Sequence, residues 1–371
     1  MLAALGSLGR QRQPSLHGSL RCLGGAALSG APGVSTPVST PVCIVGAGPT
    51  GLFLSALLTQ YKVEHVLLDR NRRLPNHPQA HFLNTRSMEL IQAHFPKLHA
   101  AVMKHSPPMD TWSSFQFCGG SLVSGVRLGI YDHFAASPPS PKDAPSDAPP
   151  PPPSAAYANL LASSPARCTH LAQNKFTRLL KSEAVDDGNV RFGAALDEIA
   201  AASPETGRRI TATFSPSSPS SPSSPPSSPS SSSSSSPPVP LDVHCDYLVG
   251  CDGSNSLVRR SALSSSFEGS AGMQYLINIY FTIDSPALTA AILDAAGPSM
   301  LYFVYNSSVI AAFVAHDIDE GEWVAQVPFF PPFQSASDYT PERCRELVLA
   351  GIVGAGVASE GIAGDALTIK A

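Results

Sequence analysis

The sequence contains little charge and no long apolar run. Asp, Glu, Lys and Arg make up 14% of its 371 residues, and the formal net charge is −4. The basic residues form no stripe, so the electrostatic footprint of a nucleic-acid-binding protein is missing. No apolar run approaches the roughly 18 residues that a membrane-spanning helix needs. We therefore expect neither nucleic acid as a partner nor a transmembrane segment.

The cysteine and histidine patterns lack the spacing of metal and redox centres. The seven cysteines are scattered and odd in number, and no Cys-x-x-Cys pair occurs. Zinc sites and redox dithiols use such closely spaced pairs. His77 and His81 are four residues apart, but Pro78 argues against the helix that would place both on one face. We expect no metal and a compartment in which thiols stay reduced.

Proline is plentiful but concentrated. Residues 135–153 are dominated by Pro, Ala and Ser, and residues 215–240 are all Ser or Pro except Val239. Such tracts bury little apolar area, so both are expected to be unstructured insertions. Without them and the N-terminal 40 residues, roughly 280 residues remain, enough for one large or two ordinary domains.

Residues 1 to about 40 have the composition of a targeting segment. Arg10, Arg12 and Arg21 are interleaved with Ser and Leu, and the first acidic residue of the chain is Glu64. Organellar transit peptides are rich in Arg and Ser and poor in acidic residues. We expect a mitochondrial or plastid transit peptide, with a plain disordered tail as the alternative.

Residues 41–69 have the layout of a dinucleotide-binding β-α-β unit. A strand at 41–45 leads into G-A-G-P-T-G at 46–51, an apolar helix follows, and a second strand ends at Asp69. In this motif Gly46 permits the tight turn, Gly48 admits a pyrophosphate, and Gly51 lets the helix pack on the strand. The helix N-terminus supplies amide donors. A glycine-rich structural turn is the alternative, but the complete context favours a nucleotide site.

The end of the second strand supplies the expected ribose contact. Asp69 lies 18 residues beyond Gly51. A carboxylate there accepts a hydrogen bond from a ribose 2′-hydroxyl and repels a 2′-phosphate. Arg70, the next residue, is included among the candidate cofactor-binding residues.

A second motif, D-Y-L-V-G-C-D-G-S-N-S-L-V-R, occupies residues 246–259. A strand-like run ends at Asp252 and Gly253, and Arg259 follows six residues later. Taken alone, the Asp-Gly pair could be a β-turn and Arg259 a solvated helix residue.

Together the two motifs resemble the FAD-dependent aromatic hydroxylases, the single-component flavoprotein monooxygenases related to phenol, dichlorophenol and polyketide hydroxylases. The resemblance extends over residues 41–371 apart from the insertions, and includes N-H-P-Q-A-H at 76–81 and H-L-A-Q at 170–173. It implies that Asp252, with Gly253 beside it, reaches FAD, that Arg259 lies where the pyrophosphate of NAD(P)H passes, and that the Gln173 amide reaches the ribityl region. Gln79 departs from the family, because many relatives have Arg there.

The resemblance also implies an activity. In this family NAD(P)H reduces FAD, molecular oxygen adds to the reduced flavin, and the resulting flavin hydroperoxide hydroxylates an aromatic, phenol-like or polyketide-like substrate. The protein contributes binding, orientation and the exclusion of water. No acid or base is required by this chemistry, so the catalytic residues stay unknown.

The expected fold is α/β, with a Rossmann-like FAD-binding domain and a second, largely antiparallel substrate-domain sheet. The FAD-binding domain is assigned to residues 41–134, 154–214 and 241–266, and the second sheet with one helix to residues 267–371. Apolar runs at 275–281, 301–305, 309–314 and 323–329 predict strands of that sheet. Thr340 and Pro341 predict the start of the helix.

A third family motif, a Gly-Asp step before a helix that points at the flavin ring, is not matched in context. Gly364 and Asp365 have its letters, but Leu367 to Lys370 predicts a strand where the motif has a helix. We therefore expect that the chain as written does not hydroxylate at a useful rate. Three possibilities stay open: a fragment of an active monooxygenase, a short protein that binds nucleotide without catalysis, and an NAD-dependent oxidoreductase.

Overall fold

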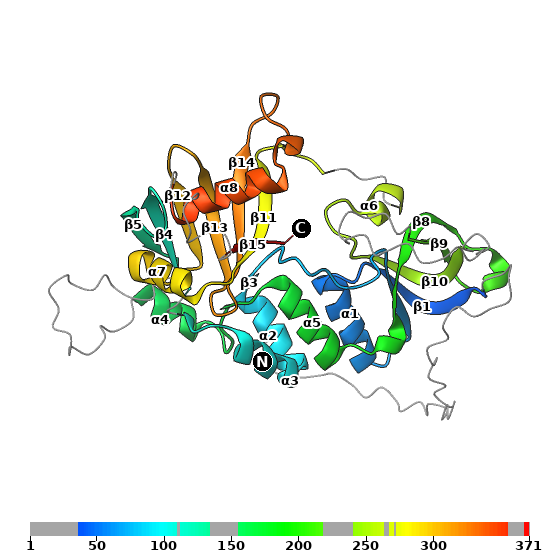
Figure 1. Ribbon diagram of the computed structural model, residues 1–371. Coiled ribbons are helices and arrows are strands. Elements are labelled where there is room, and N and C mark those ends of the chain that lie inside the picture. The colour runs from blue at the N-terminus through cyan, green and yellow to red at the C-terminus, as the bar shows by residue number, and fades with distance from the viewer. Residues whose placement is uncertain are drawn as a thin grey trace.

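The computed structural model describes residues 36–109, 112–133, 155–217, 240–262, 267–270, 272–354 and 367–370. The segment up to residue 35, the insertion at 135–153, most of the tract at 215–240 and the Gly364-Asp365 step lie outside these residues. Figure 1 shows two sheets, one in each half of the molecule, with a layer of helices against the first. The predicted α/β class with a second, largely antiparallel sheet is confirmed.

The first sheet has six strands in the order β7-β2-β1-β10-β9-β8. The first four are parallel to their neighbours, and β9 and β8 complete the sheet in antiparallel fashion. Parallel neighbours end at the same edge of a sheet, so the carboxyl ends of β1, β2 and β10 meet. The strands are β1 (Val38–Val45), β2 (His65–Asp69), β7 (Val190–Phe192), β8 (Ala194–Ala201), β9 (Ile210–Pro216) and β10 (Leu241–Gly250).

Both faces of this sheet are buried, as its continuous apolar runs predict. Cys43 and Val45 of β1 face one core, and Ile44 between them faces the other. Four helices cover the Ile44 side, each through its apolar face: α1 (Pro49–Gln60), α2 (Thr85–His94), α3 (Pro96–His105) and α5 (Gln173–Ala184). In α5 that face contains Phe176 and Leu180.

The second sheet has seven strands in the order β15-β11-β14-β13-β12-β4-β5. Only β12 and β4 are parallel; the other neighbours are antiparallel. The strands are β4 (Ser114–Gly119), β5 (Val126–Asp132), β11 (Tyr275–Ile283), β12 (Leu301–Tyr305), β13 (Ile310–Asp317), β14 (Glu322–Phe329) and β15 (Leu367–Ile369).

Alternation along the strands gives this sheet two different faces. Phe281, Phe313 and Trp323 point into a core that includes α7 (Pro286–Ala296) and α8 (Pro341–Ile352). Their neighbours Tyr280, Val314 and Val324 line a cavity on the opposite face. Thr340 caps α8 by accepting a hydrogen bond from the Arg343 amide, as predicted.

A small third sheet links the two halves. It consists of β3 (Phe82–Leu83) and β6 (Thr169–His170), which pair in antiparallel fashion. Two short helices, α4 (Ala155–Ala162) and α6 (Leu257–Ala262), are also described. No helix among the described residues is both long and apolar enough to cross a bilayer.

Two details differ from the sequence-based expectation. Residues 114–132, assigned to the FAD-binding part, form β4 and β5 of the second sheet, because β4 pairs with β12, some 185 residues away. The first strand starts at Val38, and β9 extends to Pro216, inside the tract expected to be an insertion.

Candidate functional site

Two glycines between β1 and α1 are required by the packing around them. Gly46 has a φ of +105°, and a Cβ there would lie 2.4 Å from the carbonyl oxygen of Cys251. A Cβ on Gly51 would lie 1.9 Å from the carbonyl oxygen of Gly46. Neither position has room for a side chain, so the loop closes tightly onto α1 and onto the end of β10.

Gly48 differs because the described protein leaves the space beside it open. No described heavy atom lies within 4 Å of the position that its Cβ would take, and its φ of −71° suits any residue. Gly48 is the N-cap of α1, whose first turn has neither a side-chain cap nor an acidic residue. An uncapped helix N-terminus facing open space suits a phosphate group. The loop therefore fits the predicted pyrophosphate.

Asp69, the last residue of β2, uses its carboxylate to hold the loop. Its Oδ2 accepts a hydrogen bond from the Ala47 amide at 2.6 Å, and its Oδ1 accepts one from the Asn71 amide at 2.7 Å. Each carboxylate oxygen keeps a further lone pair, so the group can still accept a hydrogen bond from a ribose hydroxyl. Arg70 is exposed beside it.

The Asp-Gly segment meets the glycine loop because β10 runs parallel to β1. The Cys251 amide donates to the Val45 carbonyl at 2.8 Å. Asp252 caps α6, its Oδ2 accepting from the Leu257 amide at 2.6 Å, while its buried Oδ1 has no hydrogen-bond partner among the described residues. Gly253 adopts a φ of +83°, which favours glycine. The turn therefore carries a buried acceptor that no described protein group satisfies.

Arg259 lies on α6 next to this turn. Its Nη1 donates to the Ser254 carbonyl at 2.9 Å, and its Cζ lies 3.9 Å from the centroid of the Phe267 ring. Its Nε is buried and makes no hydrogen bond within the described chain. The guanidinium is thus held in place, and its buried Nε–H has no described partner.

Gln173 lies apart from these motifs, at the first residue of α5. Its backbone amide donates to the Ala80 carbonyl at 2.7 Å. The structure therefore brings most of the predicted residues to one sheet edge and places Gln173 beside the wall of a separate cavity. The residues at the edge are Gly46, Gly48, Gly51, Asp69, Arg70, Asp252 and Gly253, with Arg259 beside them.

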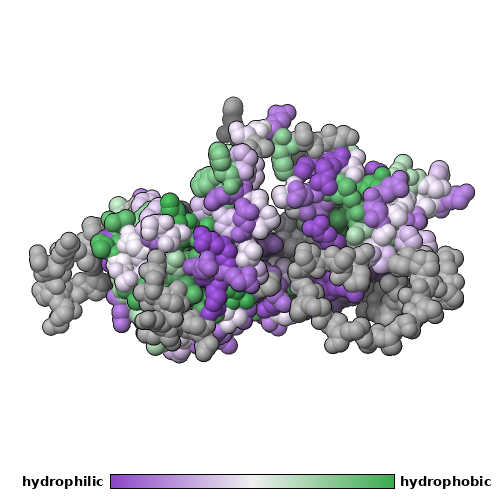
Figure 2. All heavy atoms as spheres, turned by 45° about the horizontal axis from the view of Figure 1, so that its top comes forward, coloured by the Kyte–Doolittle hydropathy of each residue, from purple (hydrophilic) through white to green (hydrophobic). Residues whose placement is uncertain are grey.

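The cavity lies between the segment at 77–82 and the free face of the second sheet. Its volume is about 650 Å³, and strands β11, β13 and β14 form one wall. In Figure 2 the molecule is hollowed between its two halves, with hydrophilic residues on both sides. A volume of this size is typical of small-molecule sites.

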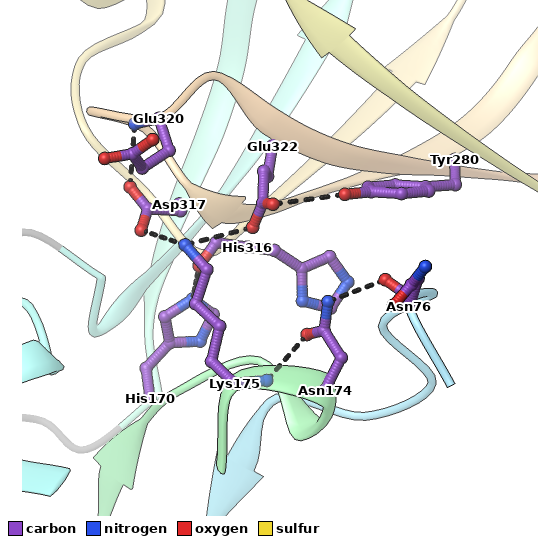
Figure 3. A network of polar contacts seen from close by, with 9 residues as sticks. All are labelled: Asn76, His170, Asn174, Lys175, Tyr280, His316, Asp317, Glu320 and Glu322. Carbon is purple, nitrogen blue, oxygen red and sulfur yellow. Dashed lines mark hydrogen bonds and ion pairs between the residues drawn. The ribbon is translucent and has the colours of Figure 1, made fainter. Parts of the chain in front are cut away.

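An ion-pair network joins the cavity wall to α5 (Figure 3). Lys175 Nζ lies 2.7 Å from Asp317 Oδ2 and 3.1 Å from Glu322 Oε2. The Tyr280 hydroxyl donates to Glu322 Oε1 at 3.1 Å. Burial, together with the negative charge of Glu322, raises the pKa of Tyr280 to about 12. The phenol therefore stays protonated at neutral pH.

Three histidines cluster at the cavity, of which His81 and His316 line it and His170 lies beside them. The ring centroid of His81 lies 5.1 Å from that of His170 and 5.3 Å from that of His316. Burial, with the nearby rings, lowers the pKa of His81 to about 4 and that of His316 to about 2. No group of three or more His, Cys, Asp or Glu in the described ranges is arranged to hold a metal ion. These rings are therefore neutral hydrogen-bonding groups.

A family model described as "FAD binding domain" matches residues 39–368, nearly the whole described chain. The chain belongs to this family. The match confirms the expected family and its cofactor, FAD.

Relatives of this FAD-binding-domain protein include named hydroxylases. Aklavinone 12-hydroxylase RdmE from Streptomyces purpurascens is 23% identical over 325 residues, which cover 83% of this chain and 49% of that protein. The 2,4-dichlorophenol 6-monooxygenase of Delftia acidovorans is 26% identical over 271 residues, covering 73% and 38%. The chain thus spans half or less of the length of these relatives.

Solved structures show the same fold. The flavin-dependent monooxygenase PieE, in complex with FAD and substrate, aligns with a TM-score of 0.62 at 20% identity and covers 83% of this chain and 46% of that one. Aklavinone-11 hydroxylase with FAD and aklavinone gives a TM-score of 0.59 at 20% identity, covering 86% and 51%.

The sequence identified the glycine-loop edge of this FAD-binding-domain protein but missed the histidine cluster. His81, His170 and His316 come from three segments separated by 89 and 146 residues. A histidine within an otherwise apolar strand, as His316 is in β13, was a signal of a buried polar group. The sequence gives no indication of which other histidines it would meet.

Proposed function

We propose that the chain binds FAD and forms the FAD- and substrate-binding part of an NAD(P)H-dependent aromatic-ring monooxygenase. One arrangement carries this proposal: a glycine loop, Asp69 and Asp252 share a sheet edge, and a cavity of about 650 Å³ lies between residues 77–82 and the second sheet. Since the chain spans about half of its relatives, the activity concerns the whole enzyme of which these residues form the cofactor and substrate walls.

FAD fits the residues at the sheet edge. The open space beside Gly48 and the uncapped start of α1 would hold its pyrophosphate, and Asp69 would accept from its ribose. Asp252, with its unsatisfied Oδ1, and the Gln173 amide would hold further parts of it. Bound there, FAD would supply the redox chemistry, passing electrons from NAD(P)H to molecular oxygen.

NAD(P)H is the proposed reductant, with Arg259 as its contact. The guanidinium is oriented by the Ser254 carbonyl and the Phe267 ring and keeps a donor free of any described partner. Arginine is suited to phosphate groups because its donors form a planar fork. NADH and NADPH are both compatible with this contact.

An aromatic substrate is proposed for the cavity. Its lining combines apolar residues such as Val314 and Val324 with polar groups such as Asn278 and Tyr280, a mixture typical of small-molecule sites. The relatives described above are named for aklavinone and 2,4-dichlorophenol. A phenol-like or polyketide-like ring is therefore the substrate class to test, with oxygen as co-substrate.

The test is an FAD titration of the full chain, followed by flavin fluorescence, with Gly48→Ala as the diagnostic variant. A methyl group at Gly48 meets no described protein atom, so the melting temperature should change by only a few degrees. It would occupy the space for the pyrophosphate, so FAD should bind at least about tenfold more weakly. Gly129→Ala is the matched control, because its Cβ also meets no described atom but lies on β5 of the other sheet.

Equal FAD affinity in the Gly48→Ala variant would contradict the proposed cofactor site. Binding of NAD⁺ but not FAD would instead indicate the NAD-dependent oxidoreductase. NAD(P)H consumption and product formation with simple phenols then test whether the chain as written is active. Bound FAD without hydroxylated product would identify a chain that binds nucleotide without catalysing the reaction alone.

A separate proposal concerns residues 1 to about 40, which we propose act as a mitochondrial or plastid transit peptide. The basis is their content of Arg and Ser and lack of acidic residues. A reporter fused behind them should be imported, and replacement of Arg10, Arg12 and Arg21 by Gln should abolish import. A reporter that stays in the cytosol would contradict the proposal.

A further inference from the structure

The hydrogen bonds of the histidine cluster determine which nitrogens carry protons. His170 Nε2 lies 3.2 Å from the backbone carbonyl oxygen of His316. A carbonyl oxygen only accepts hydrogen bonds, so Nε2 of His170 is the donor and carries a proton. Burial lowers the pKa of His170, against the opposing effect of that hydrogen bond, and the ring is neutral. Its Nδ1 therefore has no proton and is an acceptor.

The tautomer of His170 determines the tautomer of His81. His81 Nδ1 lies 3.2 Å from His170 Nδ1. Because His170 Nδ1 is the acceptor, His81 Nδ1 must donate and carries the proton. A neutral imidazole has only one N–H, and the low pKa of His81 keeps it neutral. Its Nε2 consequently presents a lone pair.

The lone pair of His81 is available to a ligand. His81 lines the cavity. Its Nε2 makes no hydrogen bond within the described residues and is not among the sealed, unsatisfied atoms. The ring is held from one side by His170 and contacted from another by His316, so its orientation is fixed.

Tyr280 presents the same kind of group to the same cavity. Its hydroxyl proton is donated to Glu322 Oε1, and a carboxylate can only accept. Lys175 pairs with the other oxygen of Glu322 at 3.1 Å. The side of the Tyr280 oxygen left for a ligand is therefore an acceptor, not a donor.

We propose that His81 and Tyr280 form an acceptor wall that selects substrates carrying a hydroxyl or amine donor, and that His170 is the positioning residue that fixes the tautomer of His81. The inference rests on the proposed function only in taking this cavity as the substrate site. A phenol can donate its O–H to one of these half-buried acceptors, whereas its methyl ether can donate to neither. A site built to pair with a donor rejects the analogue that lacks it.

The charges around His81 are compatible with a neutral ring. His170 on β6 and His316 on β13 face it and are themselves neutral. Farther along, the Lys175 ammonium on α5 faces His316, and Asp317 faces His170 and pairs with Lys175. The one cation of this group is thus already neutralised by carboxylates.

The first experiment measures the tautomers directly. Long-range ¹H–¹⁵N spectra of the histidine-labelled full chain report which ring nitrogen is protonated, and His81→Phe assigns the signal. We expect His81 protonated at Nδ1 and bare at Nε2. In His170→Phe, which keeps a ring but removes the acceptor, the His81 signal should shift to a mixture of tautomers. His170→Gln, with one donor and one acceptor, should restore it in part.

The second experiment measures selection by calorimetry with phenol and anisole, which differ by one methyl group on oxygen. The full chain should prefer phenol by about tenfold, the worth of the one hydrogen bond that only phenol can donate. The preference should fall to about threefold or less in His81→Phe, Tyr280→Phe and His170→Phe. His105→Ala, on the exposed side of α3, is the control and should keep the full preference.

The results of these two experiments test the acceptor wall, the positioning role of His170 and the proposed function separately. Equal affinity for phenol and anisole in the unaltered chain, or a proton on His81 Nε2, overturns the acceptor wall. An unchanged preference in His170→Phe overturns the positioning role. If FAD fails to bind but phenol is still preferred over anisole, the monooxygenase proposal fails and the acceptor wall stands.

Discussion

The glycine-loop edge and the cavity wall are built in different ways. At the edge, the decisive features are backbone features: the positive φ of Gly46, the open space at Gly48 and the amides held by Asp69. At the wall, they are protonation states set by contacts between distant side chains, as with His81 and Tyr280. The edge should therefore be sensitive to added atoms, and the wall to pH.

The strongest test of this difference is Gly46→Ala. The new Cβ would meet the Cys251 carbonyl at 2.4 Å in a backbone conformation that L side chains rarely adopt. Strain and overpacking together should cost roughly 3 kcal/mol or more of unfolding free energy. Urea denaturation measures it, with Gly48→Ala as the neighbouring control that should stay near the unaltered value. Equal stability of the two variants would show that the loop is not tightly packed against β10.

The wall should respond to acid. The histidines of the cluster have folded-state pKa values lowered below 6.5, to about 4 for His81 and about 2 for His316. Below pH 6.5 the unfolded chain binds protons that the folded chain does not, so stability falls as pH falls. Each such histidine contributes up to roughly 2 kcal/mol of loss between pH 7 and pH 5.

The variant His316→Phe isolates that contribution. It removes a titrating ring whose buried Nδ1 has no partner in the described structure, and it keeps an aromatic ring of similar shape. Stability curves at pH 7 and pH 5 should lie closer together for this variant than for the unaltered chain. If the difference in stability between pH 7 and pH 5 is as large in the variant as in the unaltered chain, His316 is already protonated or solvated in the fold.

The sequence predicts the glycine-loop edge better than the cavity wall. The strand-loop-helix at 41–60 was predictable because its strand, glycine loop and helix follow one another directly along the chain, and Thr340 identified the start of α8 because a helix N-cap is equally local. The assignment of β4 to the second sheet was not, because it depends on pairing with β12, far along the chain. The meeting of His170 with His316 depends on how two sheets pack, and no local pattern encodes that packing.

Asp69→Ala tests the edge through ligand affinity. The carboxylate holds the Ala47 amide at 2.6 Å and would accept from the ribose. A charge-assisted hydrogen bond is worth about 1.5–3 kcal/mol, so FAD should bind roughly ten- to hundredfold more weakly. Asp187→Ala, a surface carboxylate paired with Lys181, is the control. An unchanged FAD titration for Asp69→Ala would mean that this carboxylate only shapes the loop.

Lys175→Met tests the link between the two halves. It leaves the partly buried Asp317 and Glu322 without their cation, which should cost about 1–2 kcal/mol. Burial lowers the pKa of Lys175, but hydrogen bonds to those carboxylates outweigh it and the net pKa is raised. The stabilisation is therefore present below about pH 10.5 and lost above it. Lys181→Met, on the same helix, should cost little because its partner Asp187 is exposed.

The smallest expected effect is that of Tyr280→Phe, and it separates the two regions most cleanly. The variant loses the hydrogen bond to Glu322 at 3.1 Å, worth about 0.5–1.5 kcal/mol, and Lys175 still neutralises that carboxylate. FAD affinity should not change, because Tyr280 lies on β11 of the second sheet. Since the pKa of Tyr280 is raised to about 12, its stabilising contribution is present below pH 10 and lost as the pH rises towards 12.

Tyr302→Phe is the matched control for this last prediction. Tyr302 loses a comparable hydrogen bond, to the Gly297 carbonyl at 2.8 Å, but points into the core on the opposite face of the same sheet. Both variants should lower the unfolding free energy slightly, while only Tyr280→Phe should reduce the preference for phenol over anisole. A loss of FAD affinity in Tyr280→Phe as large as that in Asp69→Ala would show that the edge and the wall act as one site, since a single hydroxyl on the second sheet would then govern the cofactor.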